Sequence, residues 1–286
     1  MLVKFECYDC ILKQVVKMSR EIGKSEDDRK RIVREMLKHV VSEAERKNPP
    51  EMARFFYDIF TRETQVADPY RDIKIASTRI GLELLDELRP LVSKSADPLK
   101  TAIKLAIGGN IIDYGVNPDF RLAEAKNQVR QVIDAPHDEA ALTDLTDRIR
   151  RAEQVCYLLD NCGEAVLDRL VLEQIPGRVI VAVRGKPILN DVTRQEAVES
   201  GLGNYQLVDT GCAAPGVVLS EMPPDLQQAM TFSDLIVSKG QGNYESLEGN
   251  FTSRPIYYLL RVKCPVISRQ LNAPLGSIQV IGGNLD

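Results

Sequence analysis

The second half of the chain, from about residue 152, alternates short runs rich in Val, Ile and Leu with segments of helical character. Each run is followed by polar residues or glycine. The predicted strands lie at residues 155–159, 178–183, 206–209, 234–238 and 256–262. Because strands that alternate with helices form parallel sheets covered on both faces, the pattern predicts an α/β fold with a mostly parallel sheet.

The first part of the chain has helical periodicity instead. We predict that residues 1–95 form an all-α helical bundle. An aromatic stripe in it has a spacing more typical of a core than of a binding surface, and consists of Phe55, Phe56, Ile59 and Phe60. Residues 96–151 remain helical and lead into an α/β domain that we place at 96–286.

The lead-in contains two adjacent glycines, Gly108 and Gly109, inside an apolar helix. Each costs about 1 kcal/mol relative to alanine in a helix, so something approaches the backbone closely there. Close packing of two helices is one explanation. The other is a ligand, in which case Asn110 and Asp113 lie on the wall of its pocket.

Composition limits the partners that we expect. With a net charge of -4, a pI near 5.5 and no Trp, the chain lacks both the basic surplus and the stacking platform of nucleic-acid-binding proteins. No apolar run approaches the roughly 20 residues that cross a bilayer, and the first residues do not resemble a secretory signal. We therefore expect a cytoplasmic protein with no nucleic-acid or membrane partner, and make no prediction of its oligomeric state.

Six cysteines are spread unevenly along the chain, which fits a reducing compartment better than a disulfide framework. Cys7 and Cys10 form a CxxC pair. A structural zinc site needs a second ligand pair, and His39 and His137 are far apart in sequence. The pair is therefore more typical of buried or incidental thiols than of a metal or redox site, although Cys264 could approach it in the fold.

The strand predicted at 155–159 stops abruptly on Asp160 and Asn161. In an open α/β sheet, ligands bind outside the carboxyl ends of the strands, so these side chains lie where chemistry is expected. The alternative is an Asp-Asn turn whose side chains only cap the next helix.

Asp191 follows the next predicted strand, in or just after a strand-to-helix loop. Right-handed crossovers between neighbouring strands allow Asp160, Asn161 and Asp191 to converge on one point. Two carboxylates and an amide carbonyl are hard oxygen donors, which suit Mg²⁺ or Mn²⁺ and suit zinc poorly. A helix cap formed by Asp191 or Thr193 is the alternative.

The strand predicted at 234–238 leads into Lys239-Gly240-Gln241-Gly242-Asn243. Glycines allow backbone N–H groups to turn toward an anion, and the lysine adds a cation, so this loop has the composition of a phosphate-binding site. It is not a Walker A loop, because the lysine precedes the glycines. A flexible turn is the alternative.

Taken together, the strand ends predict a site for a metal-bound phosphate, with Asp160, Asn161, Asp191 and Lys239 as the catalytic residues. A bound cation would polarise a phosphoryl oxygen and activate water, while the lysine and the backbone amides stabilise charge on the transferring group. Glu164 is expected to support the metal ligands from behind. The implied reaction is hydrolysis of a phosphomonoester.

Four segments together resemble the damage-control phosphatase family, long catalogued as a domain of unknown function, and in particular its compact stand-alone archaeal members, which begin with a CxxC. They are Asp160-Asn161-x-Gly163-Glu164, the run from Lys186-Pro187 through Asn190-Asp191-Val192-Thr193, the loop from Lys239 to Glu245, and Gly109-Asn110-Ile111-Ile112-Asp113. The resemblance covers essentially the whole chain. The combination is specific, whereas each segment alone is not.

This resemblance implies a helical N-terminal bundle joined to a three-layer α/β/α domain. It implies a divalent metal held by Asp160, Asn161 and Asp191, and a substrate phosphate bound by Lys239 with the neighbouring backbone. Members of the family are metal-dependent phosphatases of small phosphorylated metabolites, including damaged sugar phosphates and phosphopantetheine forms, and Mn²⁺, Co²⁺ or Ni²⁺ often supports their activity. The Arg-Thr-x-Lys signature of the sugar-phosphate branch is not apparent here.

Three other functions remain open. A carboxyl methyltransferase dependent on S-adenosylmethionine would have a glycine-rich turn after its first strand, where this chain has only Gly163. A non-catalytic protein that binds a phosphometabolite or a metal would show no turnover. Phosphoryl-enzyme chemistry with Asp160 as nucleophile is less favoured than metal-activated water, because the Asp-x-Asp spacing of such enzymes is missing.

Overall fold

The computed structural model describes residues 1–22, 25–111, 129 and 131–285. Its centre is a six-stranded sheet with the order β3-β2-β1-β4-β5-β6. The strands are β1 (Gln154–Leu158), β2 (Arg178–Val183), β3 (Gln206–Asp209), β4 (Leu235–Lys239), β5 (Ile256–Arg261) and β6 (Ile278–Gly283). The first five are parallel, and β6 pairs antiparallel with β5. The predicted α/β class and mostly parallel sheet are confirmed, and the predicted strands are displaced by at most one residue.

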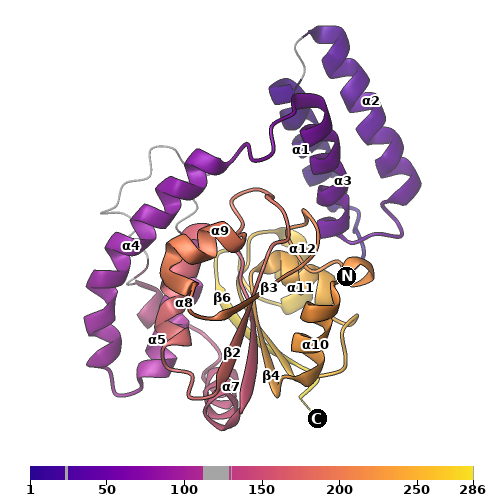
Figure 1. Cartoon of the computed structure of the whole chain (residues 1–286). Helices are drawn as coiled ribbons and strands as arrows, with labels where there is room; N and C mark the ends of the chain where they lie inside the picture. Colours follow the sequence, from indigo (N-terminus) through magenta and orange to yellow (C-terminus); the bar gives the residue numbers. More distant parts are fainter. Residues whose placement is uncertain (23–24, 112–128, 130, 286) are drawn as a thin grey trace.

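Side chains alternate along each strand, and both faces of the sheet are buried. On one face, side chains of the strands such as Val155 and Tyr157 pack with helices α5 (Pro98–Gly108), α7 (Glu139–Arg151) and α8 (Cys162–Leu172). The opposite face packs against α10 (Pro224–Phe232), α11 (Gln241–Leu247) and α12 (Pro265–Leu271). Figure 1 shows these two helical layers on either side of the sheet, so the predicted three-layer α/β/α arrangement is present.

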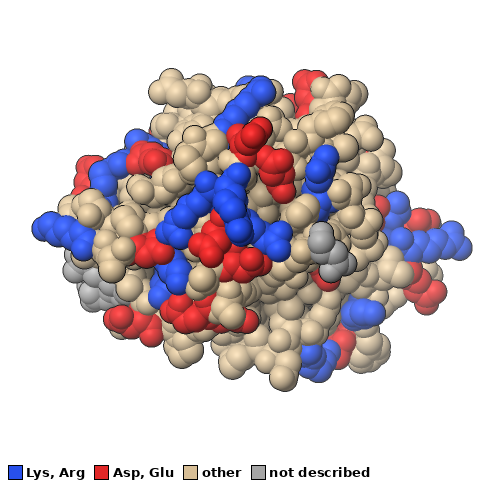
Figure 2. Space-filling model, turned by 90° about the horizontal axis from the view of Figure 1, so that it is seen from below, with Lys and Arg blue, Asp and Glu red and all other residues tan. Residues whose placement is uncertain are grey.

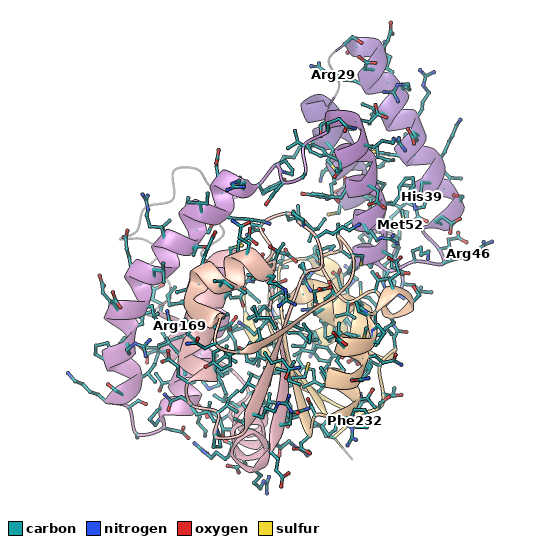
Figure 3. All side chains as sticks on the ribbon, viewed as in Figure 1. Arg29, His39, Arg46, Met52, Arg169 and Phe232 are labelled. Atoms are coloured by element: carbon teal, nitrogen blue, oxygen red, sulfur yellow. The ribbon has the colours of Figure 1, made fainter. Side chains whose placement is uncertain are left out.

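The N-terminal helices are α1 (Cys7–Ile22), α2 (Glu26–Glu43) and α3 (Pro49–Thr64), which share a core of their own. Of the aromatic stripe, Phe56, Ile59 and Phe60 are buried in that core as expected. His39 of α2 stacks on Phe55 with ring centroids 3.4 Å apart. Figure 3 shows His39 and Met52 in this group of helices, far from Arg169 on α8.

Helix α4 (Arg71–Ser93) packs against α8 rather than joining α1 to α3. Whereas the sequence pattern predicts one bundle over residues 1–95, the buried side chains of α4, among them Leu84 and Leu88, lie in the same core as the sheet. Pro90 lies inside this helix, near its C-terminal end. Because proline has no N–H, the helix lacks the hydrogen bond from this position to the carbonyl oxygen four residues earlier.

The remaining short helices connect these layers. They are η1 (Gly109–Ile111), α9 (Arg194–Ala197), η2 (Val198–Leu202) and η3 (Leu219–Glu221). None of the helices in the described part of the chain is long and apolar enough to cross a membrane. On the face that Figure 2 presents, basic and acidic side chains are interleaved.

The strand order reverses direction at one point of the sheet. From β1 the chain moves outward through β2 to β3, and then returns to β4 on the other side of β1. Connections that leave neighbouring strands in opposite directions open a crevice at their carboxyl ends, where α/β proteins bind ligands. The α1–α3 helices lie near this end, because Ile188 of the loop after β2 is part of their core and the Leu189 N–H donates to the Tyr57 hydroxyl at 3.1 Å.

Candidate functional site

Asp160 and Asn161 lie directly beyond β1, where the strand order reverses. Asn161 occupies the N-cap position of α8, yet its side chain makes no capping hydrogen bond. Asp160 and Asn161 are 8% and 7% exposed, so both are nearly buried but reachable. The helix-capping alternative therefore does not account for this pair.

The loop after β2 brings Asp191 to the same point. Asn161 and Asp191 form an isolated antiparallel bridge, and the Val192 N–H donates to the Asp160 carbonyl oxygen at 2.9 Å. Thr193, not Asp191, is the N-cap of α9, and its N–H donates to Glu196 at 2.9 Å. The backbone pairing thus brings together the three residues with oxygen-bearing side chains, as expected.

Arg184, at the end of β2, lies between the two carboxylates. Its Nε donates to Asp191 Oδ2 at 2.6 Å and its Nη2 donates to Asp160 Oδ1 at 3.1 Å. Its Nη1 donates to Asn243 Oδ1 at 2.8 Å. Arg184 was not predicted from the sequence, although a charged residue directly after the apolar run at residues 179–183 is a signal of a functional role. The guanidinium shows that the two carboxylates can share one cation.

The two carboxylates are poorly solvated. Burial raises the pKa of Asp160 well above its usual range, and the charges of Asp191 and Glu164 raise it further, whereas Arg184 and Lys263 lower it. Burial likewise raises the pKa of Asp191, and the charges of Arg184, Lys74 and Lys263 oppose the shift. Lys263, which follows β5, therefore contributes positive charge to the site from a further strand end, and the sequence analysis missed it.

Glu164 lies behind Asn161 in the first turn of α8. The Asn161 Nδ2 donates to Asp160 Oδ2 at 3.0 Å and contacts Glu164 Oε2 at 3.4 Å. The Asn110 Nδ2 donates to the same Glu164 oxygen at 2.7 Å. Glu164 thus contacts a predicted metal ligand, as expected for a residue that supports the site.

Asn110 reaches Glu164 because the helix before it packs closely on α8. A Cβ on Gly109 would lie 3.2 Å from the Glu164 Cα, so the glycine allows the two backbones to approach. Helix packing therefore accounts for this glycine and also delivers Asn110 to the site. The Asn110 Oδ1 is buried and has no hydrogen-bond partner among the described residues. Asp113, predicted for the same pocket wall, lies outside the described residues.

Lys239, the last residue of β4, is fully buried. Its ammonium contacts Glu164 Oε1 and Asp168 Oδ1, both at 2.6 Å, and the Ala106 carbonyl oxygen at 3.2 Å. Burial lowers the pKa of Lys239, but the charges of Asp168 and Glu164 outweigh this effect and raise it above its usual value. Direct phosphate binding by Lys239 therefore stays a prediction, and these contacts favour a role within the protein network.

The predicted phosphate loop continues as α11. Asn243 is fully buried, and its Nδ2 donates to the carbonyl oxygens of Lys239 and Leu159 at 2.8 and 3.3 Å. Asn243 thus ties the ends of β1 and β4 together and holds Arg184. Gly242 packs under the next loop, where a Cβ would lie 1.8 Å from the Pro215 carbonyl oxygen. Gly240 packs on the Asp160 carboxylate. Phosphate binding by these three residues remains a prediction.

The donors present fit a hard divalent cation. In the described part of the chain no three His, Cys, Asp or Glu side chains gather at one point, so the candidate set is an acid pair plus an amide. Carboxylates with an amide oxygen suit Mg²⁺ or Mn²⁺, and substrate or water would complete the coordination. Arg184, which already bridges Asp160 and Asp191, stands in for such a cation.

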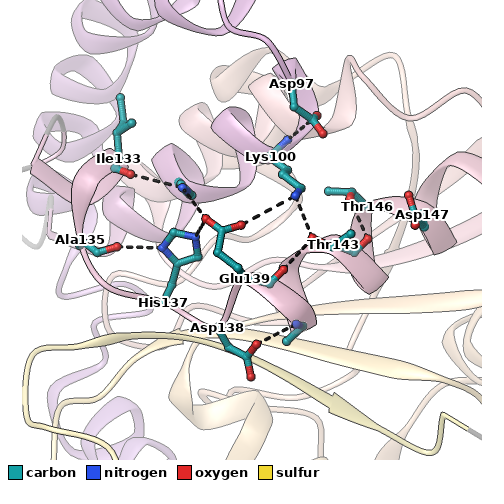
Figure 4. A network of polar contacts seen from close by, with 12 residues as sticks. Asp97, Lys100, Ile133, Ala135, His137, Asp138, Glu139, Thr143, Thr146 and Asp147 are labelled. Carbon is teal, nitrogen blue, oxygen red and sulfur yellow. Dashed lines mark hydrogen bonds and ion pairs between the residues drawn. The ribbon is translucent and has the colours of Figure 1, made fainter.

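Neither histidine contributes to this site. His39 stacks within the N-terminal helices. Figure 4 shows that His137 contacts the Ala135 carbonyl oxygen and Glu139, at the start of α7.

All six cysteines are free. Cys10 lies near Cys264, since a charge on Cys264 raises the Cys10 pKa in addition to the larger effect of burial.

Helix α11 contains one buried carboxyl group, that of Glu245. Burial raises its pKa from 4.5 to about 7, and the hydrogen bond from Gln241, 2.7 Å long, opposes this shift. The folded protein therefore binds a proton at Glu245 more tightly than the unfolded chain does. The free energy of unfolding should fall as the pH rises from about 4.5 to about 7, by up to about 3 kcal/mol.

We expect Glu245→Gln to remove this loss, because the neutral amide can still accept the hydrogen bond from Gln241. Chemical denaturation at pH 5 and pH 8 should show a variant that is more stable than the wild type mainly at pH 8. Glu248→Gln, one turn later at a partly exposed position, is the control. An equal effect of Glu245→Gln at both pH values would contradict the assignment.

Comparisons with known proteins show relatives that match nearly the whole chain. Residues 3–278 match the model of the damage-control phosphatase ARMT1-like domain. The chain is 30% identical to a damage-control phosphatase of Archaeoglobus fulgidus, over 95% of this chain and 96% of that protein. It is 28% identical to a damage-control phosphatase of Pyrococcus horikoshii, over 97% of each. The crystal structure of a DUF89 family protein from Pyrococcus horikoshii has a TM-score of 0.86 at 27% identity, and the match covers 98% of this chain and 99% of that one.

Proposed function

Because the chain belongs to the damage-control phosphatase family with the ARMT1-like domain, we propose that it is a metal-dependent phosphomonoesterase acting at the carboxyl ends of β1 and β2. The family membership supports a phosphatase of metabolite repair. The observation that carries the finer proposal is the arrangement of Asp160, Asn161 and Asp191 at the sheet crevice, where two buried carboxylates already share the charge of Arg184.

In this proposal Asp160, Asn161 and Asp191 hold the cation. Their oxygen donors suit Mn²⁺, Mg²⁺, Co²⁺ or Ni²⁺. When bound, the cation supplies Lewis-acid polarisation of a phosphoryl oxygen and lowers the pKa of a water molecule. With a cation bound, the two aspartates would hold it in their charged form, and the attraction is strong because the site is poorly solvated.

The phosphate of the substrate needs positive charge from the protein, and Arg184 and Lys263 are placed to supply it. Arg184 reaches both aspartates, and the charge of Lys263 acts on both. A guanidinium binds two phosphate oxygens through its planar fork of N–H donors. Lys263 lies two residues after β5 and is exposed, so in this proposal it would meet the phosphate from the solvent side.

Asp160 is better placed to bind than to attack. Its Oδ1 accepts from Arg184 and its Oδ2 accepts from Asn161. Because the Asp-x-Asp spacing of phosphoryl-enzyme phosphatases is missing here, we favour attack by water over a phosphoryl-enzyme. The proposed substrates are small phosphomonoesters, such as damaged or surplus sugar phosphates or phosphopantetheine-like compounds.

The test combines turnover with metal binding. The protein is stripped with a chelator and assayed with p-nitrophenyl phosphate and a panel of sugar phosphates and phosphopantetheine, with and without Mn²⁺, Co²⁺, Ni²⁺ or Mg²⁺. We expect hydrolysis only with metal, and we expect Asp160→Ala to lose both hydrolysis and calorimetric binding of Mn²⁺. Hydrolysis that survives chelation would contradict the proposal. Metal binding without turnover would indicate a binding protein, and tight S-adenosylmethionine binding without hydrolysis would indicate a methyltransferase.

A further inference from the structure

We propose that Asp168, which touches neither predicted metal ligand nor substrate, is a positioning residue for this site. It acts through Lys239 and Glu164 to fix the side-chain amide of Asn161 with its carbonyl oxygen toward the cation. The inference rests on the proposed function, because it assumes that Asn161 binds a metal. The contacts that support the inference form a continuous series from the buried side of α8 to the end of β1.

This series of contacts starts on one face of α8. Glu164 and Asp168 are four residues apart on α8 and therefore point to the same side. They are only 1% and 0% exposed. Two buried carboxylates on one helix face are strongly unfavourable unless a cation pairs with them. Lys239 provides that cation, at 2.6 Å from each.

Lys239 is held in one position by these contacts. An ammonium group has three N–H donors, and here it meets three acceptors, namely Glu164, Asp168 and the Ala106 carbonyl oxygen. Without the charge of Asp168, the ammonium would have only Glu164 as a counter-ion and could move toward it. The position of Glu164 therefore depends on Asp168.

Glu164 in turn orients Asn161. The Asn161 Nδ2 lies 3.0 Å from Asp160 Oδ2 and 3.4 Å from Glu164 Oε2, so both of its hydrogens face carboxylates. An amide whose NH₂ group is engaged in this way must present its oxygen on the other side. Because a cation needs the amide oxygen and is repelled by the NH₂ group, Glu164 selects the orientation that binds metal.

Among the described residues, the hydrogen-bond donors to Asp168 are Tyr157 and Lys239. Its Oδ1 accepts from the Tyr157 hydroxyl at 2.7 Å and from Lys239, and its Oδ2 has no hydrogen-bond partner among the described residues. A buried ion pair of this kind is weak evidence for stability, since apolar side chains of similar volume often serve as well. Its connection to Asn161 gives it a function that an apolar pair would not have.

The experiment measures Mn²⁺ affinity by calorimetry together with the unfolding midpoint. We expect Asp168→Asn to weaken Mn²⁺ binding by about 10-fold, in the range found when the groups that orient metal ligands are removed. Tyr157→Phe removes only the hydroxyl that holds Asp168 and should weaken binding in the same direction. Tyr257→Phe is the matched control, because the Tyr257 hydroxyl also donates to a helix aspartate, Asp144, away from the site.

A double-mutant cycle separates positioning from a general structural effect. If Asp168 acts through Glu164, Asp168→Asn should weaken Mn²⁺ binding much less in a Glu164→Gln background than in the wild type. Should Asp168→Asn fail to fold, the comparison of Tyr157→Phe with Tyr257→Phe decides. A lowered unfolding midpoint with unchanged Mn²⁺ affinity, in whichever variant folds, would overturn the inference.

The same measurements distinguish this inference from the proposed function. If the wild type binds Mn²⁺ and Asp160→Ala does not, the metal site stands whatever the Asp168 variants do. Unchanged affinity in Asp168→Asn then removes only the positioning role. If the wild type binds no Mn²⁺, the metal site and the positioning role both fall.

Discussion

Replacing Asp191 by asparagine is expected to reduce metal-dependent hydrolysis by at least about 100-fold, the upper end of the losses seen when groups that only orient metal ligands are changed. The substitution keeps the shape of the side chain and its acceptor for Arg184, whose Nε lies 2.6 Å from Asp191 Oδ2. It removes one of the two negative charges that attract the cation. Steady-state kinetics at saturating Mn²⁺, with calorimetric Mn²⁺ binding, measure the effect.

The fold should survive this change. Asparagine has the same shape as aspartate and keeps a side-chain oxygen that can accept the hydrogen bond from Arg184 Nε. Arg184 keeps its contacts with Asp160 and Asn243. We therefore expect the unfolding midpoint of Asp191→Asn to stay within a few degrees of the wild type.

Asp209→Asn is the matched control for Asp191→Asn. Asp209 also ends a strand at the carboxyl edge of the sheet, but its carboxylate accepts from the Gly211 N–H at 2.9 Å. This control should retain the activity of the wild type. If Asp191→Asn remained as active as Asp209→Asn, the assignment of Asp191 as a metal ligand would be wrong.

The sequence predicted the part of the site that depends on strand ends. Asp160, Asn161 and Asp191 follow apolar strands, and the parallel sheet brings such residues together without any knowledge of side-chain packing. The missed strand β6 shows where this reasoning stops. Residues 278–283 alternate only briefly and end in two glycines, and their pairing depends on the neighbouring β5 rather than on their own pattern.

The direction of the Lys239 side chain could not be predicted from its loop alone. Lys239 lies two residues after Val237 and so faces the same side of the sheet, the side covered by α5 and α8. That Lys239 lies near Asp168 and Glu164 can be known only when the fold shows which helices cover that side. Arg184 was missed for a related reason, since its three acceptors come from three separate segments.

Gly240→Ala is expected to disable the site through backbone geometry alone. Gly240 has a φ of +81°, in the left-handed region, and a Cβ there would lie 2.0 Å from Asp160 Oδ2. No L side chain fits unless Asp160 or the loop after β4 moves. A displacement of about 1 Å at a catalytic group can cost about 100-fold in rate, so we expect a loss of that order in kcat/KM. Kinetics and Mn²⁺ calorimetry measure it.

Gly249→Ala separates that clash from the cost of the backbone conformation. Gly249 also has a positive φ, +70°, but nothing lies within 4 Å of a Cβ built there. It should lose about 1 kcal/mol of stability from the left-handed conformation and keep its activity and Mn²⁺ affinity. Because the two variants share the conformational cost, the difference between them reports on contact with Asp160. Equal kcat/KM in Gly240→Ala and Gly249→Ala would show that the loop moves without displacing Asp160. The position of this carboxylate would then not be needed for activity.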